Sequence, residues 1–337
     1  MLFSTYLFSA LALLVNLSLL AVAIPQNLTE RQSSCCGYTI TNRGNVYFRF
    51  KHVVDLSTLN SIEELEDRGW IIADGWQSGG VNGITKQVPI GRRENVGIAK
   101  GEGLTLMVPR QDKNSPTLSV AEIQFPDAAL GGIFEVTVKL TSTPGTCMGI
   151  FTSHADSGLS LGWNDEQDIE MLGASLLKAQ TSPYYQPAGI QMLNYRPSYG
   201  LLLFPILPLF GTAPNQAKEA TNRSPLASIP RRATINSEIA WYPTTSGSNP
   251  PRLTEYRFDG KLLTNAPKRY PSVNPSVLVL NHWSNSDPRW SAGPPAQDAI
   301  MYVKKIVAYY DKPERKATGT GVLKGTCDRA MACKVTV

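Results

Sequence analysis

Residues 162–173 read GWNDEQDIEMLG, a stretch with an acidic side chain at three alternate positions, Glu166, Asp168 and Glu170. A β-strand directs every second side chain to the same face, so on a strand the three acids share one surface, whereas a helix would scatter them. The other parity begins with Asp165 and then turns apolar, which is typical of a strand with one solvated face and one face toward a core. The stretch therefore predicts a half-buried strand with an acidic face.

Three like charges on one face repel one another, so the arrangement needs a chemical reason. Glycoside cleavage supplies one, because one carboxylate attacks the sugar carbon while a second carboxyl group protonates the departing oxygen. On a strand, the backbones of Glu166 and Glu170 lie roughly 13 Å apart. Their carboxyl groups reach the retaining separation of about 5 Å only if the sheet is concave and the side chains lean inward. We expect Asp168, between them, to hydrogen-bond the nucleophile.

The motif Glu-x-Asp-x-Glu at residues 166–170 resembles that of glycoside hydrolase family 16, where it lies on a strand of a concanavalin A-like sandwich. Three more segments look like those of secreted fungal members: PGTCMGIF at 144–151, EYRFDG at 255–260 and NHWSNSDPRW at 281–290. The resemblance covers about residues 35 to 310. The resemblance implies a retaining mechanism with Glu166 as nucleophile, Glu170 as general acid and then base, and Asp168 orienting Glu166. The neighbouring carboxylates are expected to raise the pKa of Glu170.

Two positions depart from the family pattern. Many relatives carry His before the Glu-Tyr-Arg segment and Trp after its Asp, where this chain has Thr254 and Gly260. These departures bear on substrate contacts and leave the acids unaffected. Residues 198–219 are also apolar and Pro-rich where a polar loop is expected, which indicates either an insertion over the cleft or an error in the gene model.

The rest of the chain predicts an all-β fold. Apolar and polar residues alternate most clearly over residues 133–141, while only residues 59–67 look helical. Further strand-like runs lie at 104–108, 256–259, 277–281 and 301–310. Strands without a series of intervening helices favour a jelly-roll sandwich of two antiparallel sheets with a concave substrate cleft.

We expect one catalytic domain over residues 35–312. It follows an N-terminal segment, 24–34, and precedes a C-terminal tail, 313–337, that carries Cys327 and Cys333. There are no internal repeats.

Residues 1–23 are apolar and end Ala-Val-Ala, the pattern of a cleaved signal peptide, with an uncleaved anchor as the rival interpretation. Residues 201–210 are too short and too Pro-rich to span a membrane. Asn27 and Asn222 begin glycosylation sequons, which fits a secretory route. We therefore expect a secreted, extracellular protein, with the cell wall as a further location and no membrane partner after signal removal.

The five cysteines of a secreted chain predict disulfides, with one cysteine left over. Our preferred pairing joins Cys327 to Cys333 and Cys147 to either Cys35 or Cys36, although sequence alone does not fix connectivity. No Cys-x-x-Cys or paired-His spacing indicates a metal or cofactor. The family resemblance leaves room for a structural calcium ion that no ligand pattern supports.

Sugar rings stack on aromatic side chains, so tryptophans are candidate binding residues. We favour Trp283 as a platform, with Trp163 and Trp290 as further candidates and Asn281 as a hydrogen-bond partner of a sugar hydroxyl. The other tryptophans are expected to pack in the core or anchor loops: Trp70, Trp76 and Trp241.

His154 and His282 have no partner at a known catalytic spacing, so we expect neither to act in a site. The net charge of +5 is scattered and argues against nucleic acid as a partner.

The sequence thus predicts a monomeric, secreted endo-β-glycosidase that hydrolyses β-1,3-glucan, mixed β-1,3/1,4-glucan or a related cell-wall polysaccharide. A transglycosylase would use the same glutamates and transfer the sugar to another sugar. A lectin-like protein on the same sandwich would keep the aromatic cleft and lose an acid, whereas all three acids are present here.

Overall fold

The computed structural model describes residues 35–77, 87–155, 164–174, 176, 189–196, 217–224, 234–242, 253–263, 271–272, 274–288, 290–313 and 329–337. The predicted signal peptide, the segment 24–34, Trp163 and Cys327 lie outside these residues, as does the apolar stretch up to residue 216. No helix in the described part of the chain has the length and apolar character needed to cross a bilayer.

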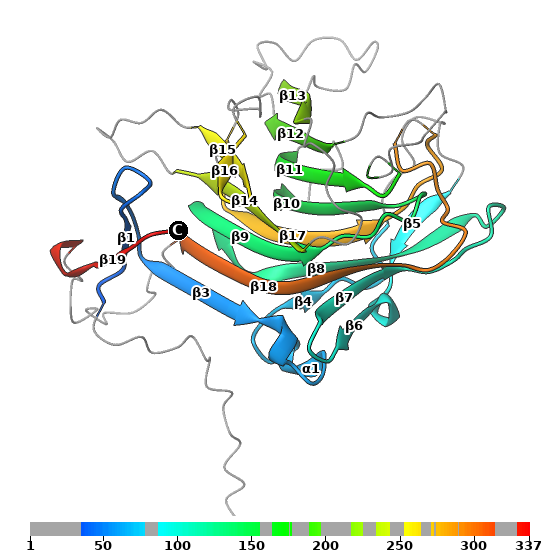
Figure 1. Ribbon diagram of the computed structural model, residues 1–337, viewed down its shortest axis with the longest axis horizontal. Coiled ribbons are helices and arrows are strands. Elements are labelled where there is room, and N and C mark those ends of the chain that lie inside the picture. The colour runs from blue at the N-terminus through cyan, green and yellow to red at the C-terminus, as the bar shows by residue number, and fades with distance from the viewer. Residues whose placement is uncertain are drawn as a thin grey trace, which may run out of the picture.

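The fold consists of two large, mainly antiparallel β-sheets packed face to face, and a small third sheet (Figure 1). The first, which we call the cleft sheet, has the order β13 (Ala217–Ser224), β12 (Ile190–Arg196), β11 (Asn164–Leu172), β10 (Cys147–Ala155), β17 (Ser276–Trp283), β8 (Thr117–Ala129) and β4 (Ile71–Ile72), with β5 (Val88–Gly91) parallel to β8. The second, the back sheet, has the order β16 (Lys261–Leu262), β15 (Thr254–Phe258), β14 (Thr234–Trp241), β9 (Gly131–Lys139), β18 (Ala299–Asp311), β7 (Gly103–Val108) and β6 (Val96–Ala99), with β3 (Phe50–Asp55) on β18.

The predicted jelly-roll sandwich is confirmed, and so are the strands expected from alternation. The helical prediction at residues 59–67 corresponds to one short helix, α1 (Glu63–Glu66). Three 3-10 turns complete the described elements: η1 (Leu56–Thr58), η2 (Arg93–Asn95) and η3 (Arg329–Met331).

The core lies between the two large sheets and follows the period-2 pattern. On β9, Phe134, Val136 and Val138 are at most 1% exposed, and on β11 the core face carries Ile169 and Met171. Because successive side chains of a strand point to opposite faces of the sheet, the other set of β11 side chains is directed away from this core. Trp70 and Trp241 are buried in the same core, as predicted for them.

The third sheet joins the two ends of the described chain. It has the order β19 (Cys333–Val335), β1 (Tyr38–Ile40) and β2 (Val46–Phe48), and β19 is parallel to β1 with Tyr38 opposite Cys333. Its apolar side chains pack on the outer face of the back sheet, against Ile133 and Tyr309. The segment expected to be a tail therefore contributes a strand to the fold.

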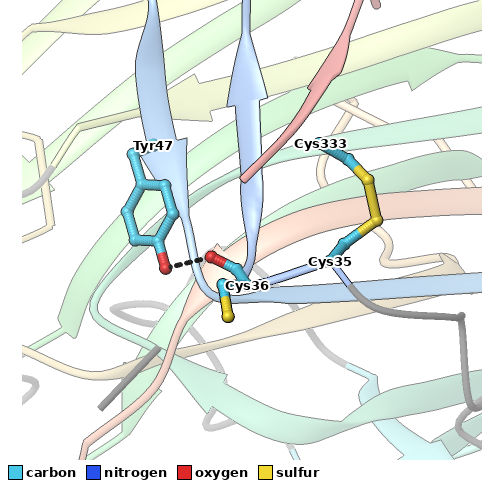
Figure 2. The surroundings of a disulfide bond; sticks show 4 residues. All are labelled: Cys35, Cys36, Tyr47 and Cys333. Atoms are coloured by element: carbon cyan, nitrogen blue, oxygen red, sulfur yellow. Dashed lines mark hydrogen bonds between the residues drawn. A yellow bond between two sulfur atoms is a disulfide. The ribbon is translucent and has the colours of Figure 1, made fainter. Parts of the chain in front are cut away.

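The predicted disulfide pairing is wrong. Cys35 is bonded to Cys333, with Cα atoms 5.3 Å apart across a sequence separation of 298 residues (Figure 2). Cys147 is free and buried on β10 of the cleft sheet. Cys36 is also disulfide-bonded, and its carbonyl accepts a 2.7 Å hydrogen bond from the hydroxyl of Tyr47 (Figure 2). The physical reason is the β1–β19 pairing, which brings Cys333 beside the N-terminal cysteines.

Candidate active site

The three acids of the motif line one cleft. Glu166, Asp168 and Glu170 lie on β11, the third strand of the cleft sheet, and all three border a cavity of about 740 Å³. Strands β10, β17 and β8 continue the floor of this cleft. The predicted substrate-binding residues Trp283 and Asn281 border the same cavity.

A hydroxyl and a second carboxyl group hold Glu166. Its cross-strand neighbour on β10 is Ser153, and both Ser153 and Asp168 form side-chain hydrogen bonds with its carboxylate. Burial raises the pKa of Glu166, and these two hydrogen bonds oppose the rise. The contact with Asp168 is the one that the spacing predicted.

Glu170 lies against the free cysteine. Cys147 is fully buried, and its thiol contacts the Glu170 carboxyl group and the indole of Trp290. Burial and the nearby Glu170 raise the pKa of the thiol far above its usual range, so Cys147 remains a neutral thiol. Trp290 does not border the cavity, so this candidate platform contacts the Cys147 thiol and not the cleft itself.

A second polar wall lies on β8, and the sequence reasoning missed it. Glu122 is 8% exposed and accepts a 3.1 Å hydrogen bond from Nε2 of Gln124, and Asn281 also bonds to it. Burial raises the pKa of Glu122, with Glu166 adding to the rise. Glu122 and Gln124 alternate with the apolar Ile123 in an otherwise apolar strand, and this pattern indicates a polar face that sequence reasoning could have found.

Asn281 has room for its side chain because β10 has Gly149 beside it. A Cβ at Gly149 would lie 2.3 Å from Oδ1 of Asn281. This Oδ1 is buried and accepts no hydrogen bond from the part of the chain that the structure describes. The amide oxygen is therefore available to a ligand in the cleft.

Gln191 is a further polar residue that the sequence reasoning missed. It lies on β12 opposite Glu170, is fully buried, and forms no side-chain hydrogen bond within the described residues. A buried amide without partners is costly in a folded protein. Gln191 does not border the cavity, so it lies beside Glu170 without lining the cleft.

Trp76 lies in a loop, one of the two positions expected for it, and it also has a place in the cleft that the sequence did not indicate. It borders the cleft with Gln77 and Pro89. Its indole lies over Gly91 of β5, where a Cβ would come within 2.1 Å of Nε1. The sequence did not indicate this role because it depends on β5 pairing in parallel with β8, a contact between separate segments.

The two histidines differ in their surroundings. His282 is fully buried between the sheets, where Nδ1 lies 2.9 Å from the Leu106 carbonyl, and burial lowers its pKa to about 4. His154 borders the cleft, and its Nδ1 lies 2.8 Å from the carbonyl of Pro275. His282 is therefore a core residue, whereas His154 is close enough to contact a ligand.

The two departures from the family motif lie away from the cleft. Thr254 is 1% exposed in the core, where it bonds to Gln167. Gly260 occupies the β15–β16 turn with φ of +75°, a conformation that favours glycine. Neither borders the cavity.

Within the described ranges, no three His, Cys, Asp or Glu side chains are grouped so that they could hold a metal ion. The calcium ion suggested by the family resemblance stays a prediction. The chemical groups that are present are paired carboxyl groups, amides and tryptophans.

Solved structures share this fold. A structure titled as a native glycosidic hydrolase has a TM-score of 0.52 and 19% identity, over 77% of this chain and 95% of the other. A β-glucanase of Bacillus licheniformis has a TM-score of 0.51 and 17% identity, over 78% of this chain and 98% of the other. No protein-family model matches the chain, and a search of curated proteins found no match. These likenesses establish the sandwich fold.

Proposed function

We propose that this protein is a secreted, retaining endo-β-glycosidase of the glycoside hydrolase family 16 type that hydrolyses β-1,3-glucan or mixed β-1,3/1,4-glucan. The observation that carries the proposal is the set of three acids on the cleft face of β11, with Asp168 hydrogen-bonded to Glu166. The shared fold with a β-glucanase supports glucan as the substrate.

Glu166 acts as the nucleophile in this proposal. One of its carboxylate oxygens attacks the anomeric carbon, the glycosidic C–O bond breaks, and Glu170 gives its proton to the departing oxygen. Glu170, now ionised, then takes a proton from water, and the water oxygen displaces Glu166 from the anomeric carbon. Two displacements retain the configuration of that carbon. The hydrogen bonds of Asp168 and Ser153 favour the ionised form of Glu166, against the effect of burial, which raises its pKa.

The remaining cleft residues bind the sugar chain. Trp283 and Trp76 offer indole faces to sugar rings, and they stand at separate places along the cleft. Asn281 and Glu122 provide hydrogen-bonding groups for hydroxyls. A cleft with binding groups on several strands suits a polymeric substrate cut within its length.

Transglycosylation is the second candidate. In that reaction the hydroxyl of a sugar acceptor replaces water in the second step. The same two glutamates serve both reactions, so the acids do not distinguish them.

The test is reducing-sugar release from laminarin, lichenan, galactan and xyloglucan by the wild type, Glu166→Gln and a control, Glu102→Gln. Glu102 lies in an exposed ion pair with Lys139, 2.9 Å away, so its substitution changes the same charge outside the cleft. We expect release from a glucan, with retained configuration at the new reducing end, by the wild type and control only.

If the protein forms longer oligosaccharides from short ones without net release of reducing ends, its reaction is transglycosylation and not hydrolysis. If neither assay detects activity but the protein still binds glucan, the enzyme proposal is overturned and the protein is a carbohydrate-binding protein.

A further inference from the structure

A chain of buried hydrogen bonds lies behind the acidic strand. Gln167 lies between Glu166 and Asp168 of the motif, on the core face of β11, and is fully buried. Its Nε2 donates to the hydroxyl of Thr152 at 3.0 Å and to that of Ser272 at 2.8 Å. Its Oε1 accepts a hydrogen bond from the hydroxyl of Thr254 at 2.5 Å. Both hydrogens and the oxygen of this amide are therefore engaged.

The chain continues through the opposite sheet. Thr254 Oγ1 accepts a hydrogen bond from Nδ2 of Asn194 at 3.1 Å, and the hydroxyl of Tyr256 donates to Oδ1 of Asn194. Thr254 and Tyr256 lie on β15 of the back sheet, while Asn194 lies on β12 of the cleft sheet. The network thus connects β10, β11 and β12 to a strand across the core.

The polar residues of this network are costly to place in a core and need their partners. Each of the six side chains is at most 5% exposed, and a buried polar group that loses its hydrogen bond costs more than the bond itself contributes. An apolar side chain at position 167 would fill the same space without depending on β15. The network therefore adds directional contacts that the packing of apolar side chains would not supply.

The position of Gln167 determines what these contacts control. Glu166 and Asp168 are its chain neighbours and point to the other face, so any rotation of β11 about its axis moves both carboxyl groups. The indole of Trp283 and the amide of Asn281 lie on β17, which the network does not include. A loosened network would therefore disturb the acids more than these sugar-binding groups.

We propose that Gln167 and Thr254 are positioning residues that hold Glu166 and Asp168 in the geometry for nucleophilic attack by anchoring β11 to β15 of the back sheet. The inference rests on the proposed function, in which Glu166 is the nucleophile. Small displacements of a reacting group cost up to about a hundredfold in rate, so the effect should appear in kcat and leave KM nearly unchanged.

The test compares Thr254→Val with Thr254→Ser. Valine keeps the shape of threonine and removes the hydroxyl, whereas serine keeps the hydroxyl and removes a methyl group. On the glucan that the wild type cleaves, we expect Thr254→Val to lower kcat about tenfold with KM within about twofold of the wild type, and Thr254→Ser to restore most of kcat. Thermal unfolding of each variant ensures that the assays use folded protein.

Wild-type kcat in Thr254→Val would overturn the proposal. So would an equal loss of kcat in both variants that follows their loss of thermal stability, because a purely structural role predicts that result.

A readout without turnover separates this inference from the proposed function. The Glu166 carboxyl group is titrated by carbon-13 NMR in the wild type and both variants. The hydrogen bond from Asp168 lowers the Glu166 pKa, so we expect that pKa to rise in Thr254→Val and to stay in place in Thr254→Ser. If no glucan is cleaved, this rise still supports the coupling between β15 and the acids, whereas an unchanged pKa overturns it.

Discussion

Two glutamates, one on each large sheet, are held in opposite ways. Glu238 lies on β14 of the back sheet, is 4% exposed, and accepts hydrogen bonds of 3.1 and 3.0 Å from the Arg43 guanidinium, with Arg257 in an ion pair at 3.3 Å. Glu166, on β11 of the cleft sheet, has hydrogen bonds from Ser153 and from Asp168. Within the described ranges, no lysine or arginine pairs with Glu166.

The difference lies in the partners, since burial raises the pKa of both glutamates. Two guanidinium groups oppose the rise at Glu238 and keep a structural carboxylate compatible with the ionised state. At Glu166 a hydroxyl and a second carboxyl group oppose it. Such a site is poorly optimised for stability and well suited to chemistry, which is the usual relation between the two in enzymes.

The largest expected effect comes from the same substitution at both sites. Glu238→Gln leaves the buried Arg43 without its carboxylate partner, while Arg257 keeps Glu255 at 3.2 Å, and should lower the free energy of unfolding by about 3 kcal/mol. Glu166→Gln removes a desolvated acid beside other acids and should leave the free energy of unfolding unchanged or raise it.

Urea unfolding of both variants at neutral pH makes this measurement. Equal destabilisation by the two substitutions would contradict the distinction between a paired structural acid and an acid held for chemistry.

His282 extends the comparison to a buried base that has no carboxylate partner among the residues that the structure describes. Its pKa of about 4 lies below the ordinary value of 6.5, so between these pH values the unfolded chain binds more protons than the folded one. The free energy of unfolding should therefore rise with pH across this window, by at most about 3 kcal/mol, and level off above it.

His282→Asn removes this titration and provides the matched control. Urea unfolding at several values between pH 4 and 7 should give a flatter pH dependence for the variant than for the wild type. Parallel curves would show that another group carries the dependence.

The smallest expected effect is at Ser153, whose hydroxyl is one of the two hydrogen-bond partners of Glu166. Ser153→Ala removes a hydrogen bond that lowers the Glu166 pKa, so the pKa should rise. In the proposed mechanism Glu166 attacks in its ionised form, so the acid limb of kcat/KM should move to higher pH, while activity on the alkaline side stays within about threefold of the wild type.

Ser237→Ala is the control for this prediction. Ser237 is buried on the back sheet, and its hydroxyl has no hydrogen-bond partner in the described part of the chain. A pH profile of kcat/KM for both variants would contradict the prediction if the two acid limbs coincide.

The sequence determined the local half of this architecture. Alternation at residues 133–141 and at the acidic motif was sufficient to predict β9 and β11, because the period of two is a property of each strand by itself. The same periodicity placed Glu166, Asp168 and Glu170 on one face. A resemblance in the motif then indicated the sandwich, which the structure confirms.

Contacts between distant segments were decided only by the tertiary structure. The Cys35–Cys333 disulfide requires β19 to lie beside β1, and the position of Trp76 in the cleft requires β5 to lie beside β8. The network of Gln167 likewise requires Thr254 to face it from another sheet. Strand periodicity states which face a residue occupies, but the partner across that face depends on pairings that many intervening residues separate.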